Sequence, residues 1–143
     1  MAENMKRNWT AADIPSQKGR TVVITGTGGI GYEIALEMTC AGAEVIMAGR
    51  NKDKGEEALR KINKRIPVGN IRFEKLDLAD LDSVKAFGER MRAQRKSLDT
   101  LVNNAAVMTP PQRQITKDEF ELQMGAQPQN QFLIISATSG GGY

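Results

Sequence analysis

The stretch TVVITGTGGIG, residues 21–31, decides how this chain folds. Its first five residues are all β-branched, which is typical of a short strand that helices cover on both faces. The glycine cluster ends that strand, and from Gly31 onward Ile34 and Met38 recur at helical spacing until Gly42 stops the pattern. A strand, a glycine-rich turn and a helix in direct succession are typical of βαβ units, which build parallel sheets.

The glycines of this turn have the spacing of a phosphate-binding loop. Gly26, Gly28 and Gly31 match Gly-x-Gly-x-x-Gly between a predicted strand and a predicted helix. Glycines allow positive φ angles and let bare backbone approach a pyrophosphate, and the start of the helix offers unpaired N–H groups. A purely structural turn is the alternative. We expect the turn to bind a dinucleotide through Gly26, Thr27, Gly28, Gly29, Ile30 and Gly31.

The same alternation of strands and helices continues along the chain. Apolar runs predict further strands over residues 44–48, 71–76, 98–102 and 132–136, with helices over residues 52–66 and after Asp80. Right-handed crossovers then give an α/β, doubly wound (Rossmann), mostly parallel sheet with helices on both faces. Residues 1–19 are expected to form an N-terminal arm anchored by Trp9, and residues 20–143 the dinucleotide-binding domain.

The turn after the second strand bears on the choice of dinucleotide. It reads Ala48-Gly49-Arg50-Asn51, with no carboxylate to accept hydrogen bonds from the adenosine ribose. Arg50 would pair with a 2′-phosphate, which favours NADP over NAD. A merely solvated Arg50 is the alternative.

Composition excludes several kinds of chemistry. The 143 residues include no His and one Cys, so Ser-His-Asp catalysis and a structural zinc site are excluded and no metal is expected. The lone Cys40 favours a reducing compartment, and we expect a cytoplasmic protein. No apolar run reaches the roughly 20 residues of a membrane span. The 20 basic residues are interspersed with 17 acidic ones, so no nucleic-acid partner is expected.

Several motifs, in order and in spacing, resemble the short-chain dehydrogenase/reductase family over about residues 9–125. They are the strand and turn of residues 22–31, the turn of residues 48–51, Leu76-Asp77-Leu78, and LVNNAA at residues 101–106. The arm WTAADIP, residues 9–15, and the Gly49-Arg50-Asn51 turn resemble the NADP-using, retinol-dehydrogenase-like branch. The resemblance implies hydride transfer between a nicotinamide and an alcohol or carbonyl substrate, by a homo-oligomer.

The resemblance also implies roles for residues at the ends of the third and fourth strands. Asp77 would meet the adenine amino group and Leu78 would wall the ring, while Asn104 and Ala105 would lie along the cofactor ribose. From the residues alone, Asp77 and Asn104 are equally well read as turn formers.

Two departures from the family pattern stand out. The glycine turn has only Thr27 and Gly28 between Gly26 and Gly29, where the family has three residues. Of the family's catalytic Ser, Tyr and Lys, the resemblance gives Ser136 or Ser139 and Tyr143, with no Lys after that Tyr. We therefore expect a fold incomplete on its C-terminal side. The alternative to an enzyme is a non-catalytic dinucleotide-binding module or an inactive truncated product.

Overall fold

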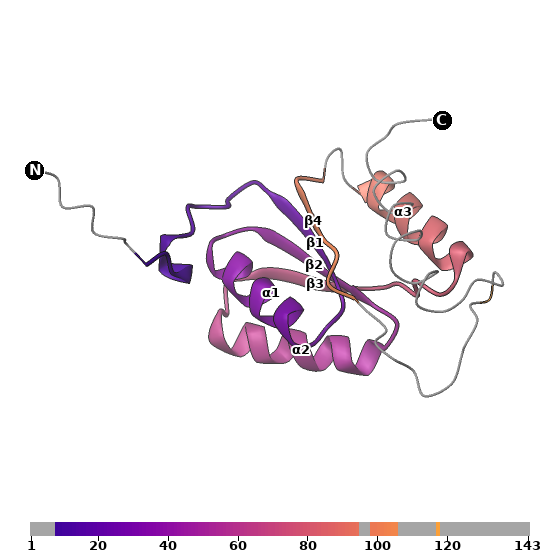
Figure 1. Cartoon of the computed structure of the whole chain (residues 1–143), viewed down its shortest axis with the longest axis horizontal. Helices are drawn as coiled ribbons and strands as arrows, with labels where there is room; N and C mark the ends of the chain where they lie inside the picture. Colours follow the sequence, from indigo (N-terminus) through magenta and orange to yellow (C-terminus); the bar gives the residue numbers. More distant parts are fainter. Residues whose placement is uncertain (1–7, 95–97, 106–116, 118–143) are drawn as a thin grey trace, which may run out of the picture.

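The computed structural model describes residues 8–94, 98–105 and 117. Strands and helices alternate along these residues, after a short 3-10 turn in the arm (Figure 1). In chain order the elements are η1 (Ala11–Asp13), β1 (Thr21–Thr25), α1 (Ile30–Cys40), β2 (Glu44–Gly49), α2 (Lys52–Arg65), β3 (Asn70–Lys75), α3 (Leu81–Gln94) and β4 (Thr100–Val102).

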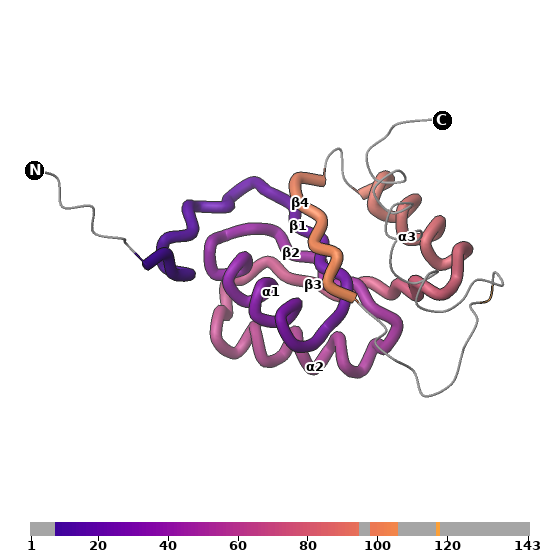
Figure 2. The backbone as a smooth tube through the Cα atoms, viewed as in Figure 1, coloured from indigo at the N-terminus to yellow at the C-terminus, as the bar shows by residue number. Residues whose placement is uncertain are grey.

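The described strands form one parallel sheet in the order β3-β2-β1-β4. Val22 of β1 lies opposite Val45 of β2 on one side and Thr100 of β4 on the other, so β1 is an interior strand (Figure 2). The chain moves outward from β1 to β3 and then returns to the far side of β1. This reversal confirms the predicted doubly wound sheet and places its switch point at the end of β1.

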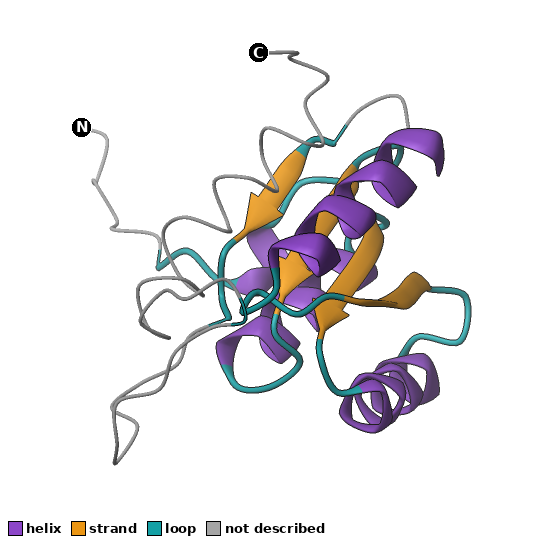
Figure 3. Cartoon of the chain, turned by 90° about the vertical axis from the view of Figure 1, so that its right-hand side faces the viewer, coloured by secondary structure: helices purple, strands orange, loops and turns teal. Residues whose placement is uncertain are grey.

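Alternate residues of the strands supply two separate cores. Val22 and Ile24 of β1 point to the face that α1 and α2 cover, whereas Val23 points to the face that α3 covers (Figures 1 and 3). This alternation is the period of two that a strand requires, and it explains why β1 and β2 read as continuous apolar runs. Helices therefore lie on both faces, as expected. The helix predicted after Asp80 is α3, and its side chains Val84, Phe87 and Met91 are buried at helical spacing.

The arm is held differently from the expectation. Trp9 is 70% exposed, so it does not anchor the arm. Gln17 does so instead, because it is buried and its backbone N–H donates to the carbonyl oxygen of Ala41 at 2.8 Å. Further out, the Asp13 carboxylate accepts hydrogen bonds from the backbone N–H and the hydroxyl of Thr10 and closes η1 locally. The division between arm and domain at residue 19 stays a prediction.

The predicted strand over residues 132–136 lies outside the described residues. Within the described ranges, no helix combines the length and the apolar character needed to cross a membrane.

Candidate functional site

A cleft of about 550 Å³ opens at the carboxyl ends of the strands, at the switch point beside β1. Open parallel sheets bind ligands at this position because the loops that leave neighbouring strands diverge there. Its walls come from all four strand ends: Thr25, Gly26, Thr27, Gly28, Gly29, Ile30, Ala48, Gly49, Arg50, Asn51, Lys54, Leu76, Asp77, Leu78, Ala79, Asn104 and Ala105.

The glycine turn presents bare backbone to this cleft. Gly26 has φ +91° and Gly29 has φ +57°, conformations that favour glycine. Among the described residues, apart from each glycine's own neighbours in the chain, no atom lies within 4 Å of the place that a Cβ would take at Gly28 or Gly29. Gly29 is the N-cap of α1 and offers no side-chain acceptor, so the first N–H groups of that helix can receive an anion. The turn thus has the open backbone that a pyrophosphate needs, although it is one residue short.

Gly31 has a different role from the other turn glycines, because it does not line the cleft. A Cβ at Gly31 would overlap the side chain of Asn104, and one at Gly26 would lie 2.9 Å from Asn104 Nδ2. The two glycines therefore leave the space that the Asn104 side chain fills. This contact brings the start of α1 against the loop after β4.

Thr25 joins the ends of β1 and β4. Its buried hydroxyl oxygen accepts hydrogen bonds from the backbone N–H groups of Asn104 and Ala105, both at 3.1 Å, and its O–H group donates to the carbonyl oxygen of Val102 at 3.4 Å. The hydroxyl thus fixes the backbone of Asn104 and Ala105 at the edge of the cleft. Sequence reasoning did not single out Thr25 as a site residue; the available signal was a polar side chain at the end of a buried strand.

The end of β2 brings two cations to the cleft. Arg50 is exposed in the turn, and Asn51 caps α2 by accepting a hydrogen bond from the backbone N–H of Lys54 at 3.1 Å. Lys54 is exposed and lines the cleft with Arg50. Among the described residues, neither cation has a carboxylate within ion-pair distance. Sequence reasoning missed Lys54, although its place in the first turn of the helix after Arg50 was a usable signal.

The end of β3 supplies an acidic residue and an apolar wall. The Asp77 carboxylate accepts a hydrogen bond from the backbone N–H of Ala79 at 2.9 Å, and the Asp77 backbone N–H donates to the Ser83 hydroxyl at 2.9 Å. Leu78 is buried in the core on the α3 face and also lines the cleft. The loop after β3 therefore has a fixed shape at this wall.

The structure brings together the residues that the sequence singled out for a cofactor. All of them line the cleft except Gly31, which lies behind the turn against Asn104. That they bind a dinucleotide stays a prediction. Ser136, Ser139 and Tyr143 lie outside the described residues.

Comparisons with known proteins agree on one family. A family model described as short chain dehydrogenase matches residues 20–132. An uncharacterised oxidoreductase of Schizosaccharomyces pombe is 44% identical over 117 residues, which are 81% of this chain and 34% of that protein. Retinol dehydrogenase 13 of mouse is 40% identical over 81% of this chain and 35% of its own length. The chain therefore spans about a third of the length of these relatives.

Solved structures show the same fold. An uncharacterised protein from Mycobacterium paratuberculosis superposes with a TM-score of 0.78 at 40% identity, over 90% of this chain and 45% of that one. A metagenomic short-chain oxidoreductase in complex with NADP superposes with a TM-score of 0.71 at 27% identity, over 84% of this chain and 55% of that one.

Proposed function

Because the chain belongs to the short-chain dehydrogenase family and has relatives in its retinol-dehydrogenase-like branch, we propose that it binds NADP at the cleft beside β1. The nicotinamide of the bound cofactor would exchange a hydride with an alcohol or carbonyl substrate. One observation carries this proposal. The bare glycine turn and the cations Arg50 and Lys54 line the same cleft. The first fits a pyrophosphate and the second fits an additional phosphate on the adenosine ribose. The NADP complex of a family member supports the choice of cofactor.

The glycine turn would hold the pyrophosphate through backbone groups. With no Cβ at Gly28 or Gly29, phosphate oxygens can approach the uncapped start of α1. The positive end of the α1 dipole attracts the negative charge there. The pyrophosphate then lies at the switch point, between the regions that would hold the two nucleotide halves.

Arg50 and Lys54 would hold the 2′-phosphate. A guanidinium can donate two parallel hydrogen bonds to one phosphate, and an ammonium adds a second charge. The two side chains flank Asn51, the cap of α2, so the start of that helix contributes a third source of positive potential. NAD lacks this phosphate, so Arg50 and Lys54 would add little to its binding affinity.

The remaining walls would position the adenosine half and the ribose beside the nicotinamide. The Asp77 carboxylate would accept a hydrogen bond from the adenine amino group, and Leu78 would pack against the ring. Asn104 and Ala105, fixed by Thr25, would lie along the ribose. When bound, the cofactor supplies or accepts the hydride, and these residues only orient it.

For proton transfer we retain Ser136, Ser139 and Tyr143 as candidates. The second candidate function is a dinucleotide-binding unit without turnover. It is favoured by one sequence observation: residues 118–143 contain neither Lys nor Arg, whereas a Tyr with a pKa near 10 needs a neighbouring cation to act as an acid or base near neutral pH. A homo-oligomer and a cytoplasmic location stay predictions.

Titration of the 143-residue chain with NADPH and NADH, followed by cofactor fluorescence, tests the cofactor proposal. We expect saturable binding of both, with a clearly lower Kd for NADPH. Equal affinities would contradict the assignment of Arg50 and Lys54. If neither cofactor bound, the shortened glycine turn would not accommodate a pyrophosphate and the proposal would fail.

A further inference from the structure

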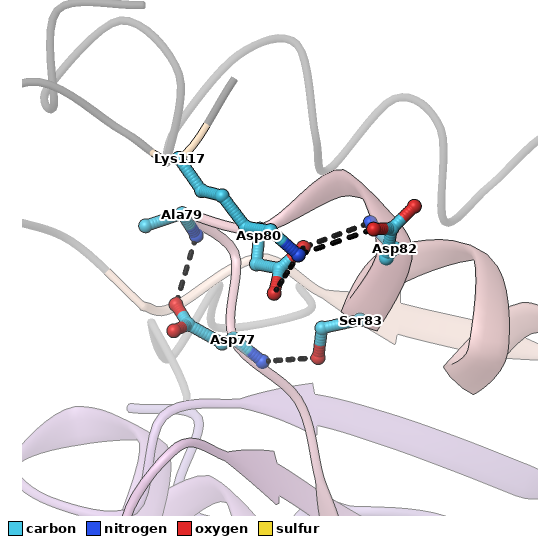
Figure 4. A network of polar contacts seen from close by, with 6 residues as sticks. All are labelled: Asp77, Ala79, Asp80, Asp82, Ser83 and Lys117. Atoms are coloured by element: carbon cyan, nitrogen blue, oxygen red, sulfur yellow. Dashed lines mark hydrogen bonds and ion pairs between the residues drawn. The ribbon is translucent and has the colours of Figure 1, made fainter. Parts of the chain in front are cut away.

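The loop between β3 and α3 is held in shape from two sides. Its first residues, 76–79, line the cleft. From within, the Asp77 carboxylate accepts from the backbone N–H of Ala79, and the Asp80 carboxylate accepts from the backbone N–H of Asp82 at 3.0 Å. These hydrogen bonds fix the turn that leads from the cleft into α3 (Figure 4).

The second side is Lys117, a residue far along the sequence. Its backbone N–H donates to the carbonyl oxygen of Ala79 at 3.2 Å. Its Nζ lies 3.3 Å from Asp80 Oδ2, across a separation of 37 residues, and 3.1 Å from Asp82 Oδ2 (Figure 4). One residue thus contacts the loop through its main chain and through its charge.

The charges at the start of α3 favour a cation at this place. Asp80 and Asp82 carry two carboxylates at the start of α3, and each repels the other. Burial alone would raise the pKa of Asp80, but hydrogen bonds from Lys117 and from the backbone of Asp82 hold it below its ordinary value. The pKa of Lys117 is raised in turn, mainly by its hydrogen bonds to Asp82 and Asp80. The ammonium therefore stays charged and bridges both carboxylates.

We propose that Lys117 is a positioning residue for the cofactor, which fixes residues 77–79 in the shape that forms the adenine wall of the cleft. Lys117 does not line the cleft, so it acts through the loop and not on the ligand. The inference rests on the proposed function, since the wall matters only if a dinucleotide binds. Its structural part, the ordering of the loop by Lys117, holds independently of any ligand.

The chain offers a matched control. Lys61 on α2 forms an ion pair with Glu57 at 3.1 Å, and its side chain is 63% exposed, compared with 60% for Lys117. Lys61 does not line the cleft. Lys117→Met and Lys61→Met therefore each remove one surface charge of comparable exposure. Lys117→Arg keeps a positive charge at position 117.

The binding experiment uses 2′,5′-ADP, which contains only the adenosine half of NADP, and NADPH. Two exposed ion pairs contribute modestly, so Lys117→Met should raise both Kd values by about two- to fivefold. Lys117→Arg should recover most of this loss, and Lys61→Met should leave both Kd values unchanged. Equal weakening by the two Met variants would show a general charge effect and overturn the inference.

Hydrogen exchange without any ligand separates this inference from the cofactor proposal. The amides of residues 77–83 should exchange several-fold faster in Lys117→Met than in wild type, with no change in Lys61→Met and an unchanged unfolding midpoint. Unchanged exchange of these amides would overturn the role of Lys117 even if NADPH binds. If these amides exchange faster in Lys117→Met and the wild-type chain binds no dinucleotide, the ordering of the loop by Lys117 is supported and only the proposed function is refuted.

Discussion

At the scale of single residues, the clearest constraint is the space that Gly31 leaves for Asn104. Gly31 lies in α1, where Ala is the better helix former, so only the steric overlap opposes substitution. We expect Gly31→Ala to lower the free energy of unfolding by about 1–3 kcal/mol, the range for overpacking a tight contact. Urea unfolding measures this change.

A matched glycine in the same turn provides the control. Gly28 has open space where its Cβ would be and no positive φ, so Gly28→Ala should change stability little. Shortening the opposing side chain by Asn104→Ala should restore much of the stability that Gly31→Ala removes. Additive losses in the double variant would show that the two residues do not compete for the same space.

The cations at the end of β2 give a prediction about cofactor choice. Arg50→Ala should weaken NADPH binding by about 1.5–3 kcal/mol, as expected for the loss of a charge-assisted contact, and leave NADH binding nearly unchanged. Lys54→Ala should act in the same direction with a smaller effect, because an ammonium makes fewer directed hydrogen bonds. Fluorescence titration with both cofactors measures each change.

Lys52 is the control for this pair. It begins α2 beside the two cations but forms an ion pair with Glu56 at 3.7 Å and does not line the cleft. Lys52→Ala should therefore leave the preference for NADPH intact. Equal losses for NADPH and NADH in Arg50→Ala would refute a contact with the 2′-phosphate.

At the scale of elements, β4 shows how a side chain can replace strand pairing. The sequence predicted a strand over residues 98–102, but β4 spans Thr100–Val102. Asp99 lies just before it, where its carboxylate accepts from the backbone N–H of Thr21 at 2.8 Å and its own N–H donates to the Thr21 carbonyl. The hydrophobic pattern locates a strand, whereas its boundary depends on such a contact between distant residues.

The short β4 is held at its other end by Thr25, which leads to a stability prediction. Thr25→Val keeps the shape of the side chain but leaves the N–H groups of Asn104 and Ala105 without their hydroxyl acceptor. We expect a loss of about 0.5–1.5 kcal/mol, the net contribution of a typical hydrogen bond, because both N–H groups are half-buried and that of Asn104 also donates to the Val102 carbonyl oxygen at 3.1 Å. Thermal or urea unfolding measures it, and Thr25→Ser should retain most of the stability.

Thr39 tests whether the effect is specific to Thr25. It is also buried, but its hydroxyl only donates to the Ala35 carbonyl within α1 at 2.6 Å. Removing that donor leaves no N–H group unpaired, so Thr39→Val should change stability much less than Thr25→Val. Similar losses in both variants would mean that Thr25 acts through packing alone.

At the scale of the whole molecule, the sequence predicted the site better than the contacts that support it. Parallel strands end at one edge of a sheet, so motifs at four strand ends had to meet there, and the cleft contains them. Lys117 and Gln17 could not be found in this way. Their partners lie far along the chain, at Asp80 and Ala41, and no local pattern specifies such contacts. Trp9 misled the prediction because an aromatic residue in a polar arm usually indicates burial.

The last prediction concerns what the 143-residue chain does as a unit. Hydride transfer needs a group that passes a proton to or from the substrate oxygen near neutral pH. The 143 residues contain no His, and residues 118–143 contain neither Lys nor Arg, so a polypeptide of these residues alone offers Tyr143 no cation close in sequence. We expect NADPH binding but no measurable reduction of ketones or aldehydes between about pH 6 and 9, because a Tyr with a pKa near 10 is a weak proton donor when no neighbouring cation stabilises its phenolate.

A steady-state assay of NADPH oxidation against a panel of carbonyl compounds checks this expectation, with NADPH binding by the same sample as its control. Binding without turnover would support the view that the glycine turn and the two cations suffice for the cofactor, while these 143 residues by themselves do not supply proton transfer. Turnover that Tyr143→Phe abolishes would contradict it. That result would mean that Tyr143 is activated by a cation elsewhere in the fold, for which the family's Tyr-x-x-x-Lys spacing is not required.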